Sequence, residues 1–447
     1  MAVDDIRIKK SLRYSVLDGT FAASMIGFGE SFFMAFAILL GATNIQIAVL
    51  GALPHTLGSF SQLFSERLIR AFRSRKRFVT TGSLMQALVF VPISAVVLLG
   101  SARIFSLILF LCLFRVFGMV IGPAWNSWMG DLTDERERGR YFGRRNKITG
   151  FSSFASFFLA GYILHGFSDG FNSEYTGFVL IFALAFFSRL VSFSYLSKKY
   201  EPFYEVTEEK VEGLVEFVRK SSSNNWGLFY LYLGIMNFSV WVSAPFFTPY
   251  MLKDLELGYL TYTLITASSI VVKFLSMPVW GRAVDQYGAR KVLSLAGFLM
   301  PVVPLLWSFS TDVVYLIVVE AYSGLIWGAF EIAAFTFVFD TTEPRKRVAF
   351  IGYSNVINGA AVLAGAMAGG IIVKYNSLFW SNYLIVFVLS FVLRLSASMV
   401  FIPRIREVRI VEEIPYTRLF LKVISVMPTM GLIYGLVPFA KKDRDEA

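Results

Sequence analysis

The sequence contains very few cysteine, histidine and charged residues. One cysteine, Cys112, and two histidines occur in 447 residues. The chain therefore cannot form an internal disulfide, and it lacks the ligands for a cysteine–histidine metal cluster. Charged residues make up 16% of the chain, whereas soluble domains average about a quarter. The length would suit two soluble domains, but this low polarity argues against them.

Motifs for nucleotide binding and for hydrolysis are also missing. The chain has no GxxxxGKS/T loop, no HExxH and no GxSxG, which are the signatures of phosphate-binding loops, zinc peptidases and serine hydrolases. Gly27 and Gly29 have no third glycine at the spacing of a dinucleotide-binding loop. We therefore expect no enzymatic activity, no cofactor and no metal.

Apolar and aromatic residues dominate the chain instead. Hydrophobic residues reach 56%, 46 residues are Phe, and the mean hydropathy is +0.61. A membrane-spanning helix needs about 20 mostly apolar residues, and the chain holds twelve such runs. We predict an all-α membrane protein whose twelve transmembrane helices lie at roughly 15–40, 45–64, 78–99, 104–130, 148–166, 175–197, 226–252, 258–280, 292–309, 313–340, 349–373 and 380–402.

The net charge of +11 is concentrated in alternating loops. Residues 65–77 and 131–147 are strongly basic, whereas the loops on the other side hold only Arg103, Lys253 and Lys374. Lys and Arg favour cytoplasmic loops, so both termini are predicted to lie in the cytoplasm. This asymmetry accounts for most of the excess charge without a nucleic acid as partner.

A polar break divides the predicted helices into two sets of six. Within that break, Val211, Leu214, Val215 and Val218 recur at helical spacing, which predicts an amphipathic helix on the membrane surface. In the C-terminal tail an apolar stretch at 415–440 is interrupted by prolines, and we expect it to be interfacial or re-entrant. The predicted order is an N-terminal tail at 1–14, a six-helix bundle at 15–197, a cytoplasmic linker at 198–225, a second bundle at 226–403 and a tail at 404–447.

The two halves resemble each other in sequence. LIFALAFFSRL near Arg189 is similar to LIVFVLSFVLRL near Arg394, and Arg75-Lys76 corresponds to Arg290-Lys291. Six helices per copy give both copies the same orientation, so we predict parallel halves around an axis along the membrane normal. Arg189 and Arg394 are predicted to extend to the cytoplasmic surface.

One motif resembles a family signature. WGRAVDQYGARK contains Gly281, Asp285, Gly288, Arg290 and Lys291, and it is similar to the cytoplasmic Gly-xxx-Asp-xx-Gly-Arg-Lys/Arg signature of the major facilitator superfamily. The resemblance covers roughly residues 15–403. It implies two six-helix bundles that alternate access to a central site, and an Asp that caps a neighbouring helix and pairs with basic residues when the cytoplasmic side is closed.

The first half departs from this signature. Glu66 and Arg70 occupy the places of its first Gly and its Asp. Arg115 and Gly118 resemble the helix 4 signature, in which an Arg lies near a proton path, while the Gly-Pro antiporter signature of helix 5 is absent. We call the following set the gate residues: Glu66, Arg70, Asp131, Arg140, Gly281, Asp285, Gly288, Arg290 and Lys291.

Ionisable side chains inside the predicted spans are costly, at about 2.5–3.5 kcal/mol each on insertion scales. Glu30 in helix 1 and Arg115 in helix 4 lie at similar depth, so we predict a pair that binds substrate or a proton. A static structural pair is the alternative. Lys273 and Glu331 are the corresponding ionisable residues of the second half, and Glu320 lies deeper in the membrane.

Amides and tryptophans in the predicted cavity helices suit an amphiphilic or sugar-like solute. Asp18 and Asp340 are interpreted as caps or interface charges, and His55 as a packing residue. The candidate substrate or proton residues are Glu30, Arg115, Asn126, Asn237, Trp241, Lys273, Glu320, Trp327, Glu331 and Asn355.

These observations predict a secondary transporter that moves a small organic solute by alternating access. We expect a proton as the coupling ion, carried by Glu30 or Glu331, and a monomer among the lipids of a prokaryotic inner membrane. The absent helix 5 signature argues against antiport. A passive facilitator, a membrane assembly factor and a sensor with a transporter-like fold remain alternatives.

Overall fold

The computed structural model consists of helices and connecting loops in the part of the chain that it describes. It describes residues 2–134, 138–203, 219, 224–341, 344–376, 378–409, 411–412 and 414–419. The predicted surface helix around Val211–Val218 and nearly all of the apolar stretch at 415–440 lie outside the described residues.

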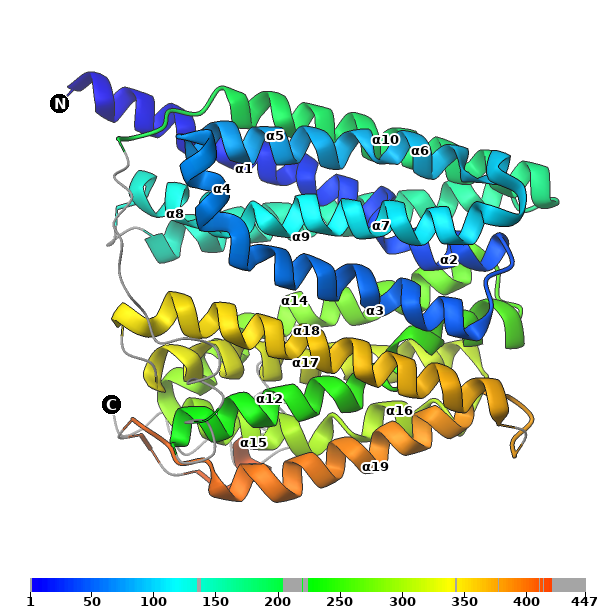
Figure 1. The fold of residues 1–447 in the computed structure, drawn as a ribbon. Helices are drawn as coiled ribbons and strands as arrows, with labels where there is room; N and C mark the ends of the chain where they lie inside the picture. Colours follow the sequence, from blue (N-terminus) through cyan, green and yellow to red (C-terminus); the bar gives the residue numbers. More distant parts are fainter. Residues whose placement is uncertain are drawn as a thin grey trace, which may run out of the picture.

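Eleven segments of the described chain are long and apolar enough to cross a membrane. The longest has 58 residues, Arg75–Leu132, and it turns at Gly100, where φ is +54°. Its two arms run antiparallel beside each other (Figure 1). Counting both arms, the described residues form the twelve predicted crossings.

The first half is a bundle of six crossings, which lie side by side in Figure 1. Crossings one, three and four are each divided into two helices, and α4 connects the second crossing to the third. The helices are α1 (Ala2–Phe28), α2 (Phe33–Leu39), α3 (Asn44–Ser61), α4 (Ser65–Phe72), α5 (Arg75–Leu88), α6 (Phe90–Ala95), α7 (Arg103–Val120), α8 (Gly122–Leu132), α9 (Arg138–Gly166) and α10 (Phe171–Ser197).

The second half repeats this arrangement. Its first crossing ends in a short helix and a π-helical turn, and its third crossing is divided near Met300. The helices are α12 (Asn225–Trp241), α13 (Phe247–Pro249), α14 (Tyr259–Tyr287), α15 (Ala289–Leu299), α16 (Val302–Leu306), α17 (Val313–Thr341), α18 (Pro344–Tyr375) and α19 (Leu384–Phe401).

The loops gather at two ends of the molecule. We call the end that holds the loops near residues 65–77 and 131–147 the basic face, and the other end, which holds Gly41 and Gly100, the opposite face. The first helix begins at the basic face (Figure 1). Here α1 starts at Ala2, so residues 2–14, predicted as a polar tail, continue the first crossing as a helix.

Two pairs of long helices join the halves. α3 packs on α18, where Thr56 donates a hydrogen bond to the Gly359 carbonyl at 2.7 Å. α9 packs on α14, and a Cβ at Gly161 would collide with Thr263. Gly365 and Gly369, predicted as a close-packing face of helix 11, lie against backbone carbonyls of α12 and of the residue after it. Small residues therefore set these close approaches, as is common between membrane helices.

Candidate functional site

The first crossing of each half is broken near its middle. α1 ends at Phe28, and a 3-10 turn over Glu30–Phe32 precedes α2. In the second half α12 ends at Trp241, and a 3-10 turn over Ala244–Phe246 follows. Short 3-10 segments within a helix often mark functional hinges. Broken helices at equivalent places are also a recurring feature of transporter binding sites.

Glu30 lies at the break in the first crossing and is paired with Arg115. The Glu30 Oε1 and Arg115 Nη2 atoms are 2.7 Å apart, and their side chains are 20% and 35% exposed. The break follows Gly29, where a Cβ would press against the Phe90 ring and Ala185. The structure thus brings together the two residues whose pairing was predicted from their depth.

His55 and Trp241 place an aromatic stack between the two halves. Their ring centroids are 6.2 Å apart and their planes differ by 19°. The next turn of α3 meets the Arg115 backbone at Gly58. His55 was interpreted as a packing residue, and this stack across the halves was missed.

The second half holds its own intramembrane ion pair. Lys273 on α14 lies 3.0 Å from Glu331 on α17, with side chains 28% and 43% exposed. Glu320 lies farther along α17 and accepts a hydrogen bond from Trp307 Nε1 at 3.2 Å. It forms no ion pair with any described residue, so it is the candidate carboxylate without a cationic partner.

The predicted amide and tryptophan residues are distributed over both halves. Asn355 bridges them, because its Nδ2 atom donates to Gln62 Oε1 at 3.1 Å. Asn237 instead bonds to its own helix at the Leu233 carbonyl. Trp327 packs beside Phe330, and Asn126 is exposed on α8. The structure therefore does not bring all the predicted lining residues to one point.

One gate residue of the first half, Asp131, binds the buried guanidinium of Arg75. Arg75 Nη1 lies 2.7 Å from Asp131 Oδ2 and 2.9 Å from Ser127 Oγ, and Glu201 lies 3.8 Å from Arg75 Nε. Glu66 and Arg70 pair with each other at 2.5 Å on the exposed side of α4. The side chain of Arg140 lies outside the part of the chain that the structure describes.

Gate residues of the second half bind the segment that follows the last crossing. Arg290 donates from its backbone N to Glu407 at 2.8 Å and from Nε to the Ile405 carbonyl at 2.6 Å. Asp285 is exposed and has no ion-pair partner among the described side chains. The carboxylate at the start of α15 is therefore Glu407, whereas the resemblance implied a capping role for Asp285.

The other gate residues in this loop have backbone and packing roles. Gly288 has a φ of +87° and ends α14, a conformation that favours glycine. A Cβ at Gly281 would lie 3.3 Å from Ile332. The ammonium group of Lys291 lies 4.8 Å from the centre of the Tyr416 ring.

In each half, a glutamate that follows the sixth crossing binds the start of a helix in the third crossing. In the first half Glu201 follows the sixth crossing and accepts hydrogen bonds from Lys76 N and Ser74 Oγ at the start of α5. Glu407 does the same for α15 in the second half. A carboxylate at a helix N-terminus contributes roughly 0.3–1 kcal/mol. These contacts were not visible in the sequence, because both acids lie outside the motif.

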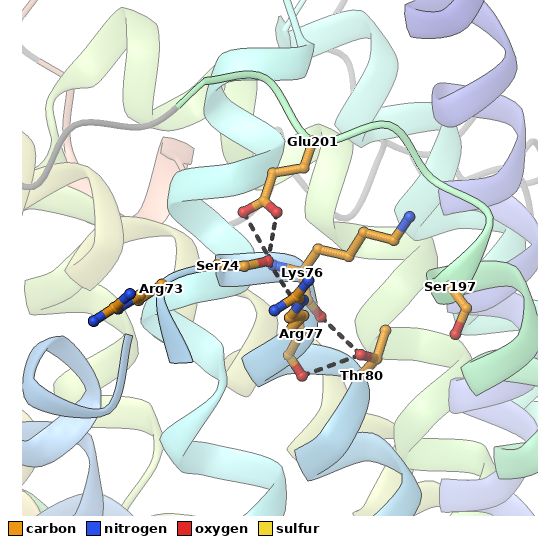
Figure 2. A pocket seen from close by; sticks show the side chains of 7 residues that line it. All are labelled: Arg73, Ser74, Lys76, Arg77, Thr80, Ser197 and Glu201. Carbon is orange, nitrogen blue, oxygen red and sulfur yellow. Dashed lines mark hydrogen bonds between the residues drawn. The ribbon is translucent and has the colours of Figure 1, made fainter. Parts of the chain in front are cut away.

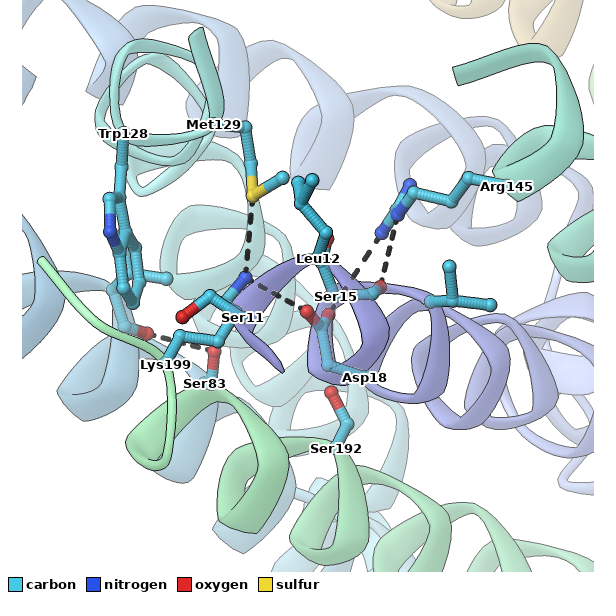
Figure 3. Close-up of polar contacts among 12 residues, drawn as sticks. Ser11, Leu12, Ser15, Asp18, Ser83, Trp128, Met129, Arg145, Ser192 and Lys199 are labelled. Carbon is cyan, nitrogen blue, oxygen red and sulfur yellow. Dashed lines mark hydrogen bonds and ion pairs between the residues drawn. The ribbon is translucent and has the colours of Figure 1, made fainter. Parts of the chain in front are cut away.

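A buried ion pair lies under the basic face of the first half (Figure 3). Lys199 is fully buried and its Nζ lies 2.9 Å from Asp18 Oδ2. Burial lowers the pKa of Lys199, and the neighbouring Asp18 opposes that shift. The ammonium lies 4.7 Å from the Trp128 ring centre, and Arg145 lies 3.9 Å from the same carboxylate. Asp18 was interpreted as a cap or an interface charge, and Lys199 was placed at the start of the linker.

Arg189 and Arg394 do not reach the surface, contrary to the prediction. Both are buried, because hydroxyl groups solvate them inside the bundle. Arg189 donates to Ser83 and Ser192, at 3.1 and 3.0 Å. Arg394 donates to Ser390 and Ser243 at 2.9 and 3.0 Å.

Side-chain hydrogen bonds join the halves mainly at the opposite face. Lys253 donates to the Ala42 carbonyl at 2.9 Å, Tyr383 to Asn44 at 2.9 Å, and Tyr259 to Glu174 at 3.1 Å. Thr56 and Asn355 add hydrogen bonds between the halves through the middle of the bundle.

The family model of the major facilitator superfamily matches residues 19–243 and 229–440. The chain belongs to this superfamily. It is thus a multi-pass membrane protein, and its fold of parallel six-helix halves agrees with the predicted class.

Relatives and solved structures agree with this assignment. Multidrug resistance protein 3 of Bacillus subtilis (strain 168) is 28% identical over 120 residues, which are 27% of this chain and 23% of that protein. Solute carrier family 67 member A1 of Homo sapiens is 28% identical over 130 residues, 28% of this chain and 30% of that protein. The chain thus matches less than a third of the length of either relative.

Two solved structures share the fold over most of the chain. A mutant of the nucleoside transporter NupG superposes with a TM-score of 0.67 at 12% identity, covering 89% of this chain and 100% of that one. A bacterial homologue of the iron transporter ferroportin, in an inward-facing state, gives 0.64 at 15% identity, covering 89% and 98%. At these identities the likeness concerns the fold alone.

Proposed function

We propose that this transporter carries a small amphiphilic organic solute by alternating access, coupled to protons, through a site between the two broken crossings. The observation that carries the proposal is the Glu30–Arg115 pair at the break of the first crossing. Both side chains are partly exposed although they lie within spanning segments. Ionisable residues at such depth are costly and usually functional.

Proton binding at Glu30 would change the charge of this site. A protonated Glu30 no longer neutralises Arg115, which then attracts an anionic or polar group of the solute. Loss of the proton restores the pair and weakens that attraction. Lys273 and Glu331 offer an equivalent response in the second six-helix half, so protons can act on both halves of the molecule.

The solute class is inferred from the neighbouring aromatic groups. His55 and Trp241 offer flat apolar surfaces, and the charged pair offers polar contacts. Mixed apolar and polar lining of this kind suits organic ligands. The Bacillus subtilis relative is named a multidrug resistance protein, and a fungal relative from Dothistroma septosporum an efflux pump, which supports an organic solute.

The contacts between the halves support a carrier with one side closed. Hydrogen bonds at Ala42, Asn44 and Glu174 close the opposite face. If the basic face lies in the cytoplasm of an inner membrane, as the loop charges favour, this conformer is closed to the outside. We propose that the gate residues bring the halves together at the basic face in the other conformer. We also propose that the protein works as a single chain without a partner subunit.

The test measures proton flux in liposomes that contain the purified protein while a panel of amphiphilic compounds is added. Wild type is compared with Glu30→Gln and with Asp169→Asn, a control at an exposed loop of the opposite face. We expect a compound-driven flux that Asp169→Asn retains and Glu30→Gln lowers at least tenfold.

Other outcomes separate the alternatives. Equal flux in Glu30→Gln would remove Glu30 from the proton path. Movement of a compound without protons would identify a passive facilitator. Neither binding nor movement across a broad panel would favour an assembly factor or a sensor.

A further inference from the structure

A basic pocket opens at the basic face between the start of α5 and the end of α10 (Figure 2). Its volume is about 460 Å³. It is separate from the site at Glu30, and none of its basic side chains belongs to the gate residues. Its walls include Arg73, Ser74, Lys76, Arg77, Ser197 and Glu201.

The three cationic side chains of the pocket have no anionic partner in the described part of the chain. No ion pair connects Arg73, Lys76 or Arg77 to another described residue. The acid in the wall, Glu201, already accepts hydrogen bonds from Ser74 Oγ at 2.6 Å and from Lys76 N at 3.1 Å. The pocket therefore keeps a positive charge that an anionic group can neutralise.

Local hydrogen bonds hold the backbone from which these side chains project. Arg73 adopts a φ of +53° where α4 ends, and Ser74 caps α5 by accepting a hydrogen bond from Arg77 N at 3.0 Å. Thr80 donates to the Lys76 carbonyl one turn later. The three cationic side chains thus project from a turn whose backbone is held by hydrogen bonds.

Apolar side chains continue from the pocket toward the middle of the membrane. On the Arg77 side of α5 and α6, Met85, Leu88 and Val91 are 38%, 43% and 56% exposed. On the neighbouring α10, Phe187 is 60% exposed. All four lie within spanning segments. A ligand that fills the pocket and follows these side chains is anionic at one end and apolar at the other.

We propose that this pocket binds the phosphate headgroup of an anionic phospholipid from the leaflet at the basic face. The acyl chains lie along the exposed side chains of α5, α6 and α10. Arg donates two parallel hydrogen bonds to phosphate oxygens, and basic pockets between transmembrane helices on the cytoplasmic side suit such headgroups. Free phosphate shares the charge but leaves the apolar side chains without a partner.

The test titrates the full-length protein in neutral detergent with phosphatidylglycerol, phosphatidylcholine or inorganic phosphate, and counts bound molecules by native mass spectrometry. The double variant Lys76→Gln/Arg77→Gln is compared with Arg144→Gln/Lys147→Gln, which removes two exposed charges elsewhere on the basic face. Each lost positive charge should lower the affinity for phosphatidylglycerol about fivefold. The first variant should therefore bind this lipid roughly 25-fold more weakly. The second should match wild type.

A second measurement uses the wild-type protein, so it does not depend on how the variants fold. Phosphatidylglycerol with a photoreactive acyl chain should label peptides that contain Met85, Leu88 or Phe187. Equal phosphatidylglycerol affinity in the two double variants, or labelling elsewhere, would overturn the proposal. Competition by inorganic phosphate as strong as that by the lipid would instead identify a site for free phosphate.

Discussion

At the residue scale, the interior of this protein accepts charge only where partners surround it. Lys199 is enclosed by Asp18, the Trp128 ring and Met129. Arg394 has hydroxyl groups and a backbone carbonyl around it and no carboxylate among the described residues. In both cases polar contacts take the place of water, as buried charges require.

The Asp18–Lys199 pair leads to a stability prediction. Asp18→Asn leaves the Lys199 ammonium buried without its counter-charge, and removal of one partner of a buried pair typically costs about 3–5 kcal/mol. Thermal unfolding of the purified protein should therefore occur at a clearly lower temperature. The double variant Asp18→Asn/Lys199→Met should recover much of the loss. An unfolding temperature equal to that of wild type in Asp18→Asn would contradict this.

At the element scale, close helix packing depends on a few glycines. Gly324 on α17 approaches the Ser269 carbonyl of α14 so closely that a Cβ would collide with it. Because backbone atoms cannot move aside as a flexible side chain can, the two helices must separate to accept a larger residue. These helices also carry Glu331 and Lys273, so their spacing sets the geometry of that pair.

The substitution Gly324→Ala tests this packing. We expect a loss of about 1–3 kcal/mol in the free energy of unfolding, which is typical of overpacking. Gly352→Ala on α18 is the matched control, because no atom lies within 4 Å of its Cβ position. The control should be neutral or slightly stabilising, since Ala favours helix by about 1 kcal/mol over Gly. Similar losses in both variants would refute the packing argument.

The crossings were predictable from the sequence because membrane spans need long apolar runs, and Glu30 and Arg115 were paired correctly from their depth. The breaks in the first crossing of each half were not predicted. The sequence around Gly29 does not show that the Phe90 ring of another helix lies against it. Lys199 was also missed, because a lysine after a helix usually lies in solvent.

At the scale of the whole molecule, two tyrosine hydroxyls connect the halves at the opposite face. Tyr259 donates to Glu174 and Tyr383 to Asn44. Each hydrogen bond contributes about 0.5–1.5 kcal/mol. The conformer closed at this face should therefore depend on both bonds, and their removal should favour the other conformer.

The double variant Tyr259→Phe/Tyr383→Phe tests this dependence. Spin labels at Asp169→Cys and Asp312→Cys, one in each half, report the distance across the opposite face, in a Cys112→Ser background. We expect the conformer with the longer distance to become more stable relative to the closed one, by about 1–3 kcal/mol compared with wild type. Tyr375→Phe, an exposed tyrosine at the end of α18, is the control and should leave the distances unchanged. Unchanged distances in the double variant would show that these bonds do not hold the face closed.

The central claim is that protons at Glu30 shift the molecule between two conformers that open at different faces. The most direct measurement follows two label pairs in lipid as the pH is lowered: Asp169→Cys with Asp312→Cys at the opposite face, and Arg144→Cys with Arg282→Cys at the basic face. The account predicts that the two distances change in opposite directions, and that Glu30→Gln removes most of this response. Distances that do not respond to pH, or that change in the same direction at both faces, would contradict it.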